Sequence, residues 1–449
     1  MASSIENKLH RFLSAQYKID QPVLLAFSGG PDSLALLHLL LDYQKKHPLR
    51  FALAHVDHGW REESKEEARL IAKMADELGL ALHLKTLDPR ALSGNLEAAC
   101  REERLLFFAF LCDVYRYQAV LLAHHADDLA ETVLKRALEG ASLAYLSGLR
   151  PQTEVYGIKL WRPLLEISKK EIGAWLYSRG LKGFEDRTNN DPRFLRGKFR
   201  TRIIPQLSQE FGKEAANGLC RIGVESTELR AYLDERIAPY LSKIIHGKLG
   251  DFLDLSEDFP KAPFELKYLI RRYCESRELQ LSRDALNLAA TLFEEGTANK
   301  AIIIGNKKLY IDRRRLFLFN ASWNSLPHQR KILKIDEVAS FGHWRIKMTA
   351  RSHSLYSFSD WKDLWRKGIL EAILPDGVYE IALPESSAPY PRSLPLSKWW
   401  TDHKIPAFLR NLVPILYENG SVRHEFLTGK LALLPKNESS FFTISLWIE

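Results

Sequence analysis

The first 150 residues alternate between short apolar runs and longer helical patterns. Val23–Phe27, Phe51–Val56 and Ala119–Ala123 are short apolar runs of the kind that form buried strands. Leu34–Lys46 and Asp127–Leu138 have the spacing of helices. Strands that alternate with helices predict an α/β fold with a parallel, doubly wound sheet.

The pattern changes after about residue 150. Residues 206–330 are mainly helical in pattern, with strand-like runs at Lys300–Ile304 and Leu316–Phe319. Residues 336–449 carry many prolines, tryptophans and β-type runs, which are typical of a small α+β domain. At roughly 150 residues per domain, the 449-residue chain predicts three domains, at 1–205, 206–330 and 336–449.

Composition excludes several classes of protein. No apolar run approaches the ~20 residues of a membrane-spanning helix, and the start of the chain lacks the apolar core of a signal peptide. The four cysteines form no CxxC pair, so a disulfide scaffold and a zinc ribbon are disfavoured. These features predict a cytoplasmic protein that does not enter a membrane. The net charge of +8 fits either a polyanionic partner or simple solubility.

A glycine-rich loop separates the first expected strand from the first helix. Its small residues allow backbone N–H groups to close around a phosphate at the helix N-terminus. Asp32 offers a hard oxygen ligand for a Mg²⁺ ion between phosphates. The Walker and GxGxxG patterns are absent, and a plain glycine turn remains the alternative. The residues that would line the phosphate are Ser28, Gly29, Gly30, Pro31, Asp32 and Ser33.

Polar side chains follow the second expected strand. Ala54 and His55 lie at the carboxyl end of that strand, where ligands bind in open α/β sheets. Their backbone is therefore a candidate contact for a base beside the phosphate loop. His55, Asp57 and His58 could also suggest a metal, but polar residues at a strand end explain them more simply.

Two further helices carry charged residues with helical spacing. Arg101 and Arg104 share one face and could clamp a phosphate, or simply pair with nearby acids. His124, Asp128 and Glu131 share a face of the helix after the expected strand at 119–123. Two carboxylates without a basic neighbour call for a cation, either Mg²⁺ or a substrate ammonium. An acidic first turn favoured by the helix dipole is the alternative.

Residues 184–205 are rich in basic side chains interleaved with aromatic rings. Such a stretch suits an RNA backbone and splayed bases, although a solvated basic loop has the same composition. The candidates for RNA contact are Arg193, Arg196, Arg200 and Arg202.

Together these blocks resemble the tRNA(Ile)-lysidine synthetases, a family of PP-loop ATP pyrophosphatases. The matching blocks are SGGPDS (28–33), HVDHGWR (55–61), NLEAACREER (95–104), HHADDLAET (124–132), LEGASLAYLSGL (138–149), WRPLL (161–165) and EDRTNNDPRFLRGKFR (185–200). The resemblance is strong over about residues 20–205 and continues more weakly to the end of the chain.

The resemblance implies a reaction in two steps. ATP with Mg²⁺ adenylates the 2-oxygen of the wobble cytidine in the isoleucine tRNA with a CAU anticodon, and pyrophosphate leaves. The ε-amine of free L-lysine then attacks carbon 2, and AMP leaves. The product, lysidine, pairs with A instead of G, so decoding changes from AUG to AUA. The family also leaves a homodimer open.

The resemblance also implies roles for individual residues. Ser28–Ser33 would cradle pyrophosphate, with Asp32 near Mg²⁺. Ala54 and His55 would contact adenine. Arg104 and His124 would serve adenylation. Asp128 and Glu131 would receive lysine, and one of them would help to deprotonate it. Arg196 and Arg200 would approach the tRNA, and residues 206–449 would hold the acceptor stem and other tRNA surface.

Three other functions remain as rivals. A PP-loop tRNA thiolase shares the adenylating chemistry, but thiolases usually bring paired cysteines. A tRNA-binding protein with a decayed site would not need Asp32, Asp128 and Glu131. A generic ATPase would need a Walker loop.

Overall fold

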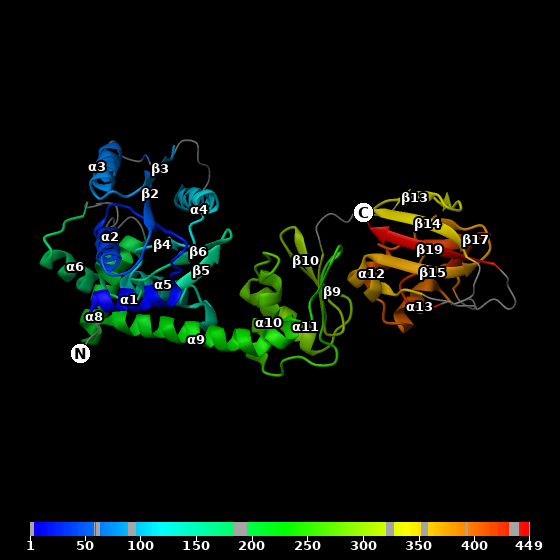
Figure 1. The fold of residues 1–449 in the computed structure, drawn as a ribbon. Coiled ribbons are helices and arrows are strands. Elements are labelled where there is room, and N and C mark those ends of the chain that lie inside the picture. Colours follow the sequence, from blue (N-terminus) through cyan, green and yellow to red (C-terminus); the bar gives the residue numbers. More distant parts are fainter. Residues whose placement is uncertain are drawn as a thin grey trace. The chain divides into compact units, whose positions relative to one another are not determined.

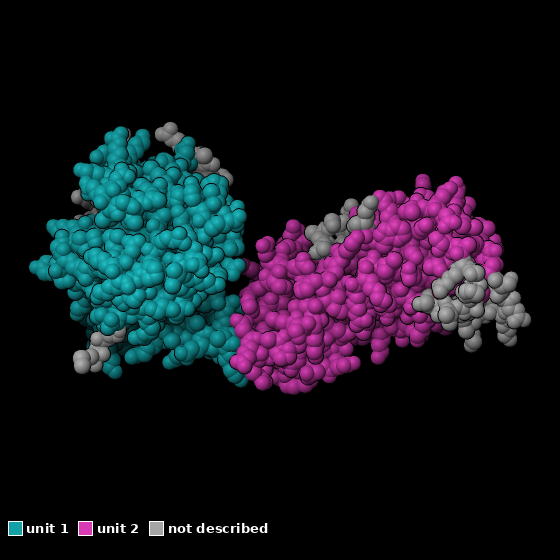
Figure 2. Space-filling model, viewed as in Figure 1, with its two compact units in different colours: residues 1–232 teal, residues 233–449 magenta. Residues whose placement is uncertain are grey.

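The chain forms two compact units, Met1–Tyr232 and Leu233–Glu449 (Figure 2). The structure is a computed structural model that describes residues 4–57, 59, 63–88, 96–183, 195–319, 327–351, 358–390, 394–430 and 440–448. The division into three domains at 205 and 330 stays a prediction. No helix in these ranges is long and apolar enough to cross a membrane.

The first unit is built on a six-stranded sheet in the order β3-β2-β1-β4-β6-β5 (Figure 1). All neighbouring strands are parallel except the β5–β6 hairpin. The predicted α/β class with a parallel sheet is confirmed. The strands are β1 (Val23–Ala26), β2 (Phe51–Asp57), β3 (Leu82–Thr86), β4 (Val120–Leu121), β5 (Gln152–Val155) and β6 (Ile158–Trp161).

Apolar side chains of this sheet alternate between two helical layers. On β1, Leu25 packs in one core with α1, α2, α3 and α6, whereas Leu24 packs on the opposite face with α4. The sheet is therefore covered on both faces, as a doubly wound fold requires. The helices are α1 (Ile5–Gln16), α2 (Pro31–Gln44), α3 (Glu63–Glu77), α4 (Leu96–Tyr115), α5 (Ala126–Leu138) and α6 (Lys169–Ser178).

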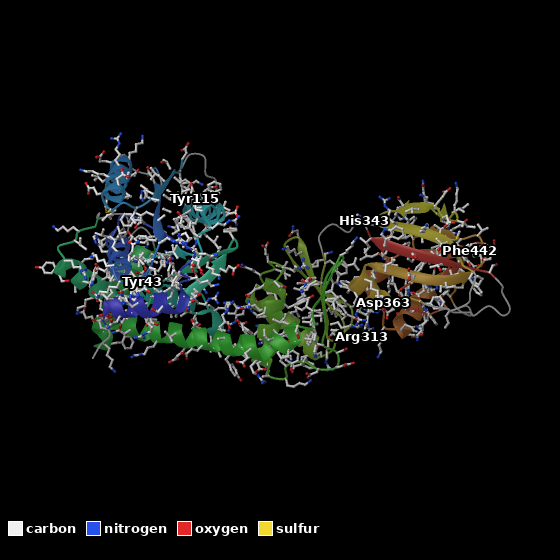
Figure 3. The ribbon with its side chains drawn as sticks, viewed as in Figure 1. Tyr43, Tyr115, Arg313, His343, Asp363 and Phe442 are labelled. Atoms are coloured by element: carbon white, nitrogen blue, oxygen red, sulfur yellow. The ribbon has the colours of Figure 1, made fainter. Side chains whose placement is uncertain are left out.

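Aromatic side chains pack α2 against α1. Tyr43, labelled in Figure 3, lies near the end of α2. Its ring centroid lies 4.8 Å from that of His10 on α1 and 4.2 Å from that of His47. Such ring contacts add specific packing to the apolar core. They fix α2 at the end opposite its N-terminus, where the glycine-rich loop lies.

The strand order reverses around β1 and β4, which are neighbours. From β1 the chain proceeds outward through β2 to β3, and it then returns to β4 on the other side of β1. Loops at the carboxyl ends of such neighbouring strands diverge and leave a crevice, where open α/β sheets bind ligands. The glycine-rich loop follows β1, and the paired histidines follow β4, so both lie at the position where such sheets bind ligands.

A series of helices follows the sheet. Four of them are α7 (Leu195–Lys198), the π-helical turn η4 (Phe199–Ile203), α8 (Ile204–Phe211) and α9 (Ala215–Leu241). Cys220 and Leu219 of α9 pack against Leu129 and Val133 of α5. A side chain at Gly223 would meet Leu129 and Val133 at 3.1 Å. The start of α9 is therefore packed closely on α5.

The second unit begins with a five-stranded antiparallel sheet in the order β7-β8-β11-β10-β9. The sequence indicated β9 and β11, but β7, β8 and β10 differ from the mainly helical expectation. The strands β7 and β8 are joined by a turn at Gly247–Gly250 and are too short to show a clear period of two. The elements are β7 (Ile245–Gly247), β8 (Gly250–Asp254), α10 (Pro263–Glu275), α11 (Arg283–Glu294), β9 (Lys300–Ile304), β10 (Lys307–Ile311) and β11 (Arg315–Phe319).

Two four-stranded sheets complete the second unit, in the orders β12-β16-β17-β18 and β13-β14-β19-β15. The α+β character predicted for residues 336–449 agrees with this arrangement, and Phe442 lies on the long strand β19 (Figure 3). The elements are β12 (Lys331–Ile332), β13 (Val338–Phe341), β14 (Trp344–Arg351), α12 (Trp361–Lys367), β15 (Ile369–Pro375), β16 (Glu380–Ala382), α13 (Leu396–Asp402), α14 (Ala407–Arg410), β17 (Ile415–Glu418), β18 (Ser421–His424) and β19 (Phe441–Ile448).

Trp399 and Trp400 show how this part of the core is held. Their indole N–H groups donate to the fully buried Glu425, at 3.0 and 2.7 Å. Trp400 itself is fully buried. These two tryptophans therefore belong to the core of the second unit.

Candidate active site

The glycine-rich loop leaves the start of α2 open to a ligand. Gly29 has a φ of +83°, which a glycine adopts without strain. The Ser33 hydroxyl donates to the carbonyl of Gly30 at 3.0 Å and lies 3.1 Å from the Ser28 hydroxyl. Within the described residues no side chain caps α2, whose first residue is Pro31. Its first N–H groups therefore suit an anion such as a phosphate.

Gly183, which no sequence pattern singles out, lies directly against this loop. A Cβ atom at Gly183 would lie 2.7 Å from the backbone nitrogen of Pro31 and 2.9 Å from the carbonyl carbon of Gly30. Both neighbours are backbone atoms, so neither can rotate away. The segment after α6 therefore supports the loop from outside, and only glycine fits there.

The end of β2 is tied to the loop by hydrogen bonds. Nδ1 of the buried His55 lies 2.9 Å from the carbonyl of Phe27, and the Ala54 carbonyl accepts from the Phe27 N–H at 2.8 Å. Asp57 accepts the N–H of Gly59 at 2.8 Å. His55 and Asp57 therefore have local partners, which supports the reading of polar residues at a strand end. The adenine contact of Ala54 and His55 stays a prediction.

A cluster of carboxylates surrounds His125, which precedes α5. Its Nε2 atom lies 3.6 Å from Asp32 and 3.5 Å from Asp128, and its Nδ1 atom lies 3.5 Å from Asp127. Burial alone would lower the pKa of His125, but these carboxylates raise it to about 10. His125 is therefore a buried imidazolium at neutral pH. It joins the loop after β1 to the first turn of α5.

The two carboxylates predicted to receive lysine already hold a cation. The Arg200 guanidinium donates through Nε to Glu131 at 2.7 Å and through Nη2 to Asp128 at 3.0 Å. Glu131 is 3% exposed, and burial raises the pKa of its carboxyl although Arg200 opposes the shift. We call Asp127, Asp128 and Glu131 together the acidic side of the site.

His124 has the opposite environment. Burial lowers the pKa of its ring to about 4; Asp128 opposes this shift, and three nearby arginines reinforce it. The Nδ1 atom of His124 is buried and has no hydrogen-bond partner among the described residues. His124 is therefore neutral at pH 7. The three arginines are Arg104, Arg162 and Arg196.

The charges that lower the pKa values of Arg104 and Arg162 come from neighbouring arginines. Burial lowers the pKa of Arg104, and the charges of Arg101 and Arg196 add to the shift. Neither Arg104 nor Arg162 forms an ion pair with any carboxylate in the described ranges. We call Arg101, Arg104, Arg162 and Arg196 the basic side of the site. Such a cluster calls for an anion.

The predicted RNA contacts divide into three groups. Arg196 and Arg202 are exposed, as an RNA contact requires. Arg200 is less available for an RNA contact, because its guanidinium pairs with both Asp128 and Glu131. Arg193 lies outside the described residues. All four assignments to tRNA stay predictions.

Asp32 fits the role of a magnesium ligand. Its Oδ1 atom is buried and has no hydrogen-bond partner among the described residues. Burial raises the pKa of this carboxyl, but His125 and nearby positive charges outweigh that effect, so the pKa lies below its usual value. The described residues contain no cluster of three or more protein groups that could hold a metal. Phosphates and water would therefore supply most ligands, as is usual for Mg²⁺.

Three residues of this site escaped the sequence analysis: His125, Arg162 and Gly183. His125 and Arg162 lie within quoted motifs, HHADDLAET and WRPLL, but spacing alone does not show which member of a motif is buried. Arg162 could have been noticed as a basic residue directly after an apolar strand. Gly183 carried no signal, because its neighbour Pro31 is distant in the sequence.

Comparison with known proteins identifies the family of this chain. A family model described as a PP-loop domain matches residues 1–207. The tRNA(Ile)-lysidine synthase of Protochlamydia amoebophila is 37% identical over 428 residues, covering 95% of this chain and 93% of the relative. The synthase of the same name from Chlamydia trachomatis serovar A is 37% identical over 284 residues, covering 63% of this chain and 87% of the relative.

Among solved structures, the similarity is distant. The U34-tRNA thiolase NcsA from Methanococcus maripaludis, with its [4Fe-4S] cluster, has a TM-score of 0.42 and 20% identity. The alignment covers 50% of this chain and 78% of the thiolase. A likeness of this size carries no argument about function.

Proposed function

Because this chain belongs to the tRNA(Ile)-lysidine synthase family, we propose that it joins L-lysine to the wobble cytidine of the CAU-anticodon isoleucine tRNA. In the first step the cytidine 2-oxygen attacks the α-phosphorus of ATP, and pyrophosphate leaves. In the second step the ε-amine of lysine attacks carbon 2, and AMP departs with the former 2-oxygen. Adenylation is needed because a ring carbonyl oxygen is a poor leaving group, whereas AMP is a good one.

The observation that carries the proposal is the pair of carboxylates that bridge one cation beside the phosphate loop. Asp128 and Glu131 bind the Arg200 guanidinium at 3.0 and 2.7 Å. An amino-acid ammonium has the same charge and can replace or share these contacts. The PP-loop family supplies the ATP use, so a cation seat next to a phosphate seat matches an enzyme that adenylates and then transfers an amine.

The loop of residues 28–33 suits the phosphates of ATP. The N–H groups at the start of α2 and the hydroxyls of Ser28 and Ser33 can donate to phosphate oxygens. Asp32 would hold Mg²⁺, which when bound neutralises phosphate charge. Ala54 and His55 would meet the adenine.

The basic side suits the transfer of the adenylyl group. Arg104 can stabilise negative charge that develops on the α-phosphate, and its partial burial strengthens that effect. His124 is neutral at pH 7, since the pKa of its ring is lowered to about 4. It can therefore donate one hydrogen bond to a phosphate or base oxygen without adding a charge.

The acidic side suits the activation of lysine. The ε-ammonium must lose a proton before it can attack carbon 2. Glu131 is the better candidate for the base, because burial raises the pKa of its carboxyl. Asp128 would hold the ammonium in place. The positively charged His125 would bridge Asp32 and Asp128 and so hold the phosphate loop against the first turn of α5.

The rest of the chain is assigned to the tRNA. Arg193, Arg196, Arg200 and Arg202 would approach the anticodon arm, and residues 206–449 would bind other parts of the tRNA. The thiolase alternative lacks support, because none of the four cysteines forms a CxxC pair. The cytoplasmic location and a homodimer stay predictions.

The direct test is the incorporation of radiolabelled lysine into CAU-anticodon isoleucine tRNA with ATP and Mg²⁺. We expect labelling by the wild-type protein and none by Asp32→Ala. Asp42→Asn is the matched control, because Asp42 lies on the same helix but pairs with Lys45 at 2.8 Å. Release of pyrophosphate with no lysine labelling in the wild type would contradict lysine as the nucleophile.

A further inference from the structure

Arg162 is a buried arginine whose charge the described part of the protein leaves uncompensated. It directly follows β6 and is 4% exposed. Its Nη1 atom donates to the Arg150 carbonyl at 2.9 Å and to the Thr153 hydroxyl at 3.0 Å. Its Nε atom is buried and has no partner within the described ranges. Both bonds go to neutral acceptors, so the charge itself has no counterion among the described residues. A buried charge without a counterion is unfavourable unless a ligand supplies one.

The charges of the described residues that act on Arg162 are also positive and do not compensate its own charge. The charges of Arg101 and Arg150 act on Arg162, and burial lowers its pKa to about 10. Arg101 lies on α4 and is exposed to solvent, and its charge acts on the buried guanidinium of Arg162. Two acids of α4 are engaged elsewhere: Glu103 pairs with Lys85 at 2.8 Å, and Glu102 accepts from Tyr156 at 3.3 Å.

The position of Arg162 separates it from the phosphate loop. Its strand β6 is two strands from β1, with β4 between them, a distance of about 10 Å across the sheet. Thr153 lies on β5, on the far side of β6 from β4. The guanidinium is therefore held toward β5 and away from the loop that would hold ATP. It nevertheless shares the carboxyl edge of the sheet, because β4 and β6 are parallel.

We propose that Arg162 and Arg101 bind a backbone phosphate of the RNA strand that carries the target cytidine. This inference rests on the proposed function and assigns a positioning role that the mechanism above does not use. The phosphate would fix the strand beyond His124, so that the base enters the crevice between the basic and acidic sides. Phosphate contacts of this kind set register and orientation, without reading sequence.

The test measures the affinity for isoleucine tRNA transcript as a function of salt. Each phosphate contact on a single strand contributes about 0.7 to the slope of log affinity against log salt. We expect Arg162→Gln and Arg101→Gln each to weaken tRNA binding by about tenfold or more and to reduce the slope by about 0.7. Affinity for ATP should stay unchanged.

A second test variant and a control variant complete the experiment. Arg101 is exposed, so Arg101→Gln keeps the inference testable if Arg162→Gln does not fold. Arg69→Gln is the matched control, because Arg69 lies on α3, has an 80% exposed side chain and pairs with Glu66 at 3.3 Å. It should leave the slope at the wild-type value.

Three results would overturn the inference. A wild-type slope in both variants would leave Arg162 with a structural role only. A loss of ATP affinity with unchanged tRNA binding would assign the anion to the nucleotide. A slope reduced equally in Arg69→Gln would reflect net charge alone. Because binding is measured without turnover, these outcomes are distinct from a failure of lysine labelling, which would overturn the proposed function instead.

Discussion

His124 and His125 are neighbours in the sequence, yet they have opposite charge states. Carboxylates raise the pKa of His125 to about 10, whereas burial among arginines lowers the pKa of His124 to about 4. His125 has extended backbone, with φ −122° and ψ −177°. Successive side chains of extended backbone point in opposite directions. One strand end can therefore serve two regions of opposite charge.

This difference in charge explains how one site can bind both a cationic amine and anionic phosphates. The acidic side holds a cation, as shown by Arg200 between Asp128 and Glu131. The basic side holds the arginines around His124 and suits phosphates. If both substrates bound to one region, the ammonium and the phosphates would pair with each other. Separate regions keep the amine apart from the phosphates until the adenylated base lies between them.

The largest effect is expected from the acidic side. Glu131→Gln should reduce lysine incorporation by about 10³-fold or more, because it removes the base from the second step. Pyrophosphate release in the presence of tRNA should fall by less than about tenfold, since adenylation uses the other side. Rapid-quench assays of both steps measure this ratio.

Glu139→Gln is the control for Glu131→Gln. Glu139 lies at the other end of α5 and pairs with Lys135 at 3.7 Å, so both steps should proceed at wild-type rates. An equal loss of both steps in Glu131→Gln would contradict the division of the site.

A smaller effect is expected from the basic side. Arg104→Gln should slow pyrophosphate release by about 10² to 10³-fold, as for the loss of one donor to a developing charge. Lysine transfer from a preformed adenylated tRNA should be nearly unaffected. Arg116→Gln is the control, because Arg116 directly follows α4, is exposed and pairs with Asp113 at 3.7 Å. If transfer slowed as much as adenylation, the two sides would not act separately.

A steric change should affect the phosphate loop without changing the charge of the acidic side or of the basic side. Gly183→Ala should raise the KM for ATP by about tenfold, because its Cβ would lie 2.7 Å from Pro31. The KM for lysine should not change. Gly173→Ala on α6 has open space and should leave kinetics intact while stabilising the helix by up to about 1 kcal/mol. An unchanged KM for ATP in Gly183→Ala would mean that the backbone at Gly30 and Pro31 shifts to accept the methyl group without weakening ATP binding.

The smallest effect concerns stability and pH. The pKa of His125 is raised when the protein is folded, from 6.5 to about 10. Its ion pairs therefore stabilise the fold fully below about pH 6.5, and this contribution disappears as pH rises toward 10. The difference in Tm between the wild type and His125→Gln should shrink by roughly 5 °C across that range. Thermal melts at constant ionic strength measure it, and a constant difference would argue against a charged His125.

Much of the fold could be predicted from the sequence, because it depends on local pattern. The apolar runs at 23–27 and 119–123 correspond to β1 and β4, and the loop between β1 and α2 was expected. Asp128 and Glu131 share a helical face, and the structure brings them to one cation. Short hairpins such as β7–β8 were missed, because three to five residues show no clear period.

The charge states of the site could not be predicted in this way. The pKa of His125 depends on Asp32, which lies after another strand, and that of His124 depends on Arg104 and Arg162 from two further segments. Only the order of strands in the sheet brings these groups together. A sequence motif identifies the residue types, but tertiary packing decides which histidine is charged.

The opposite charge states of the two histidines can be measured by a ¹⁵N NMR titration of the histidine side chains, with His124→Gln and His125→Gln used for assignment. We expect one ring to stay an imidazolium up to about pH 9 and its signal to be lost in His125→Gln. We expect a second ring to stay neutral down to about pH 5 and its signal to be lost in His124→Gln. Titration of both rings near their ordinary pKa of about 6.5 would contradict the division of the site into sides of opposite charge.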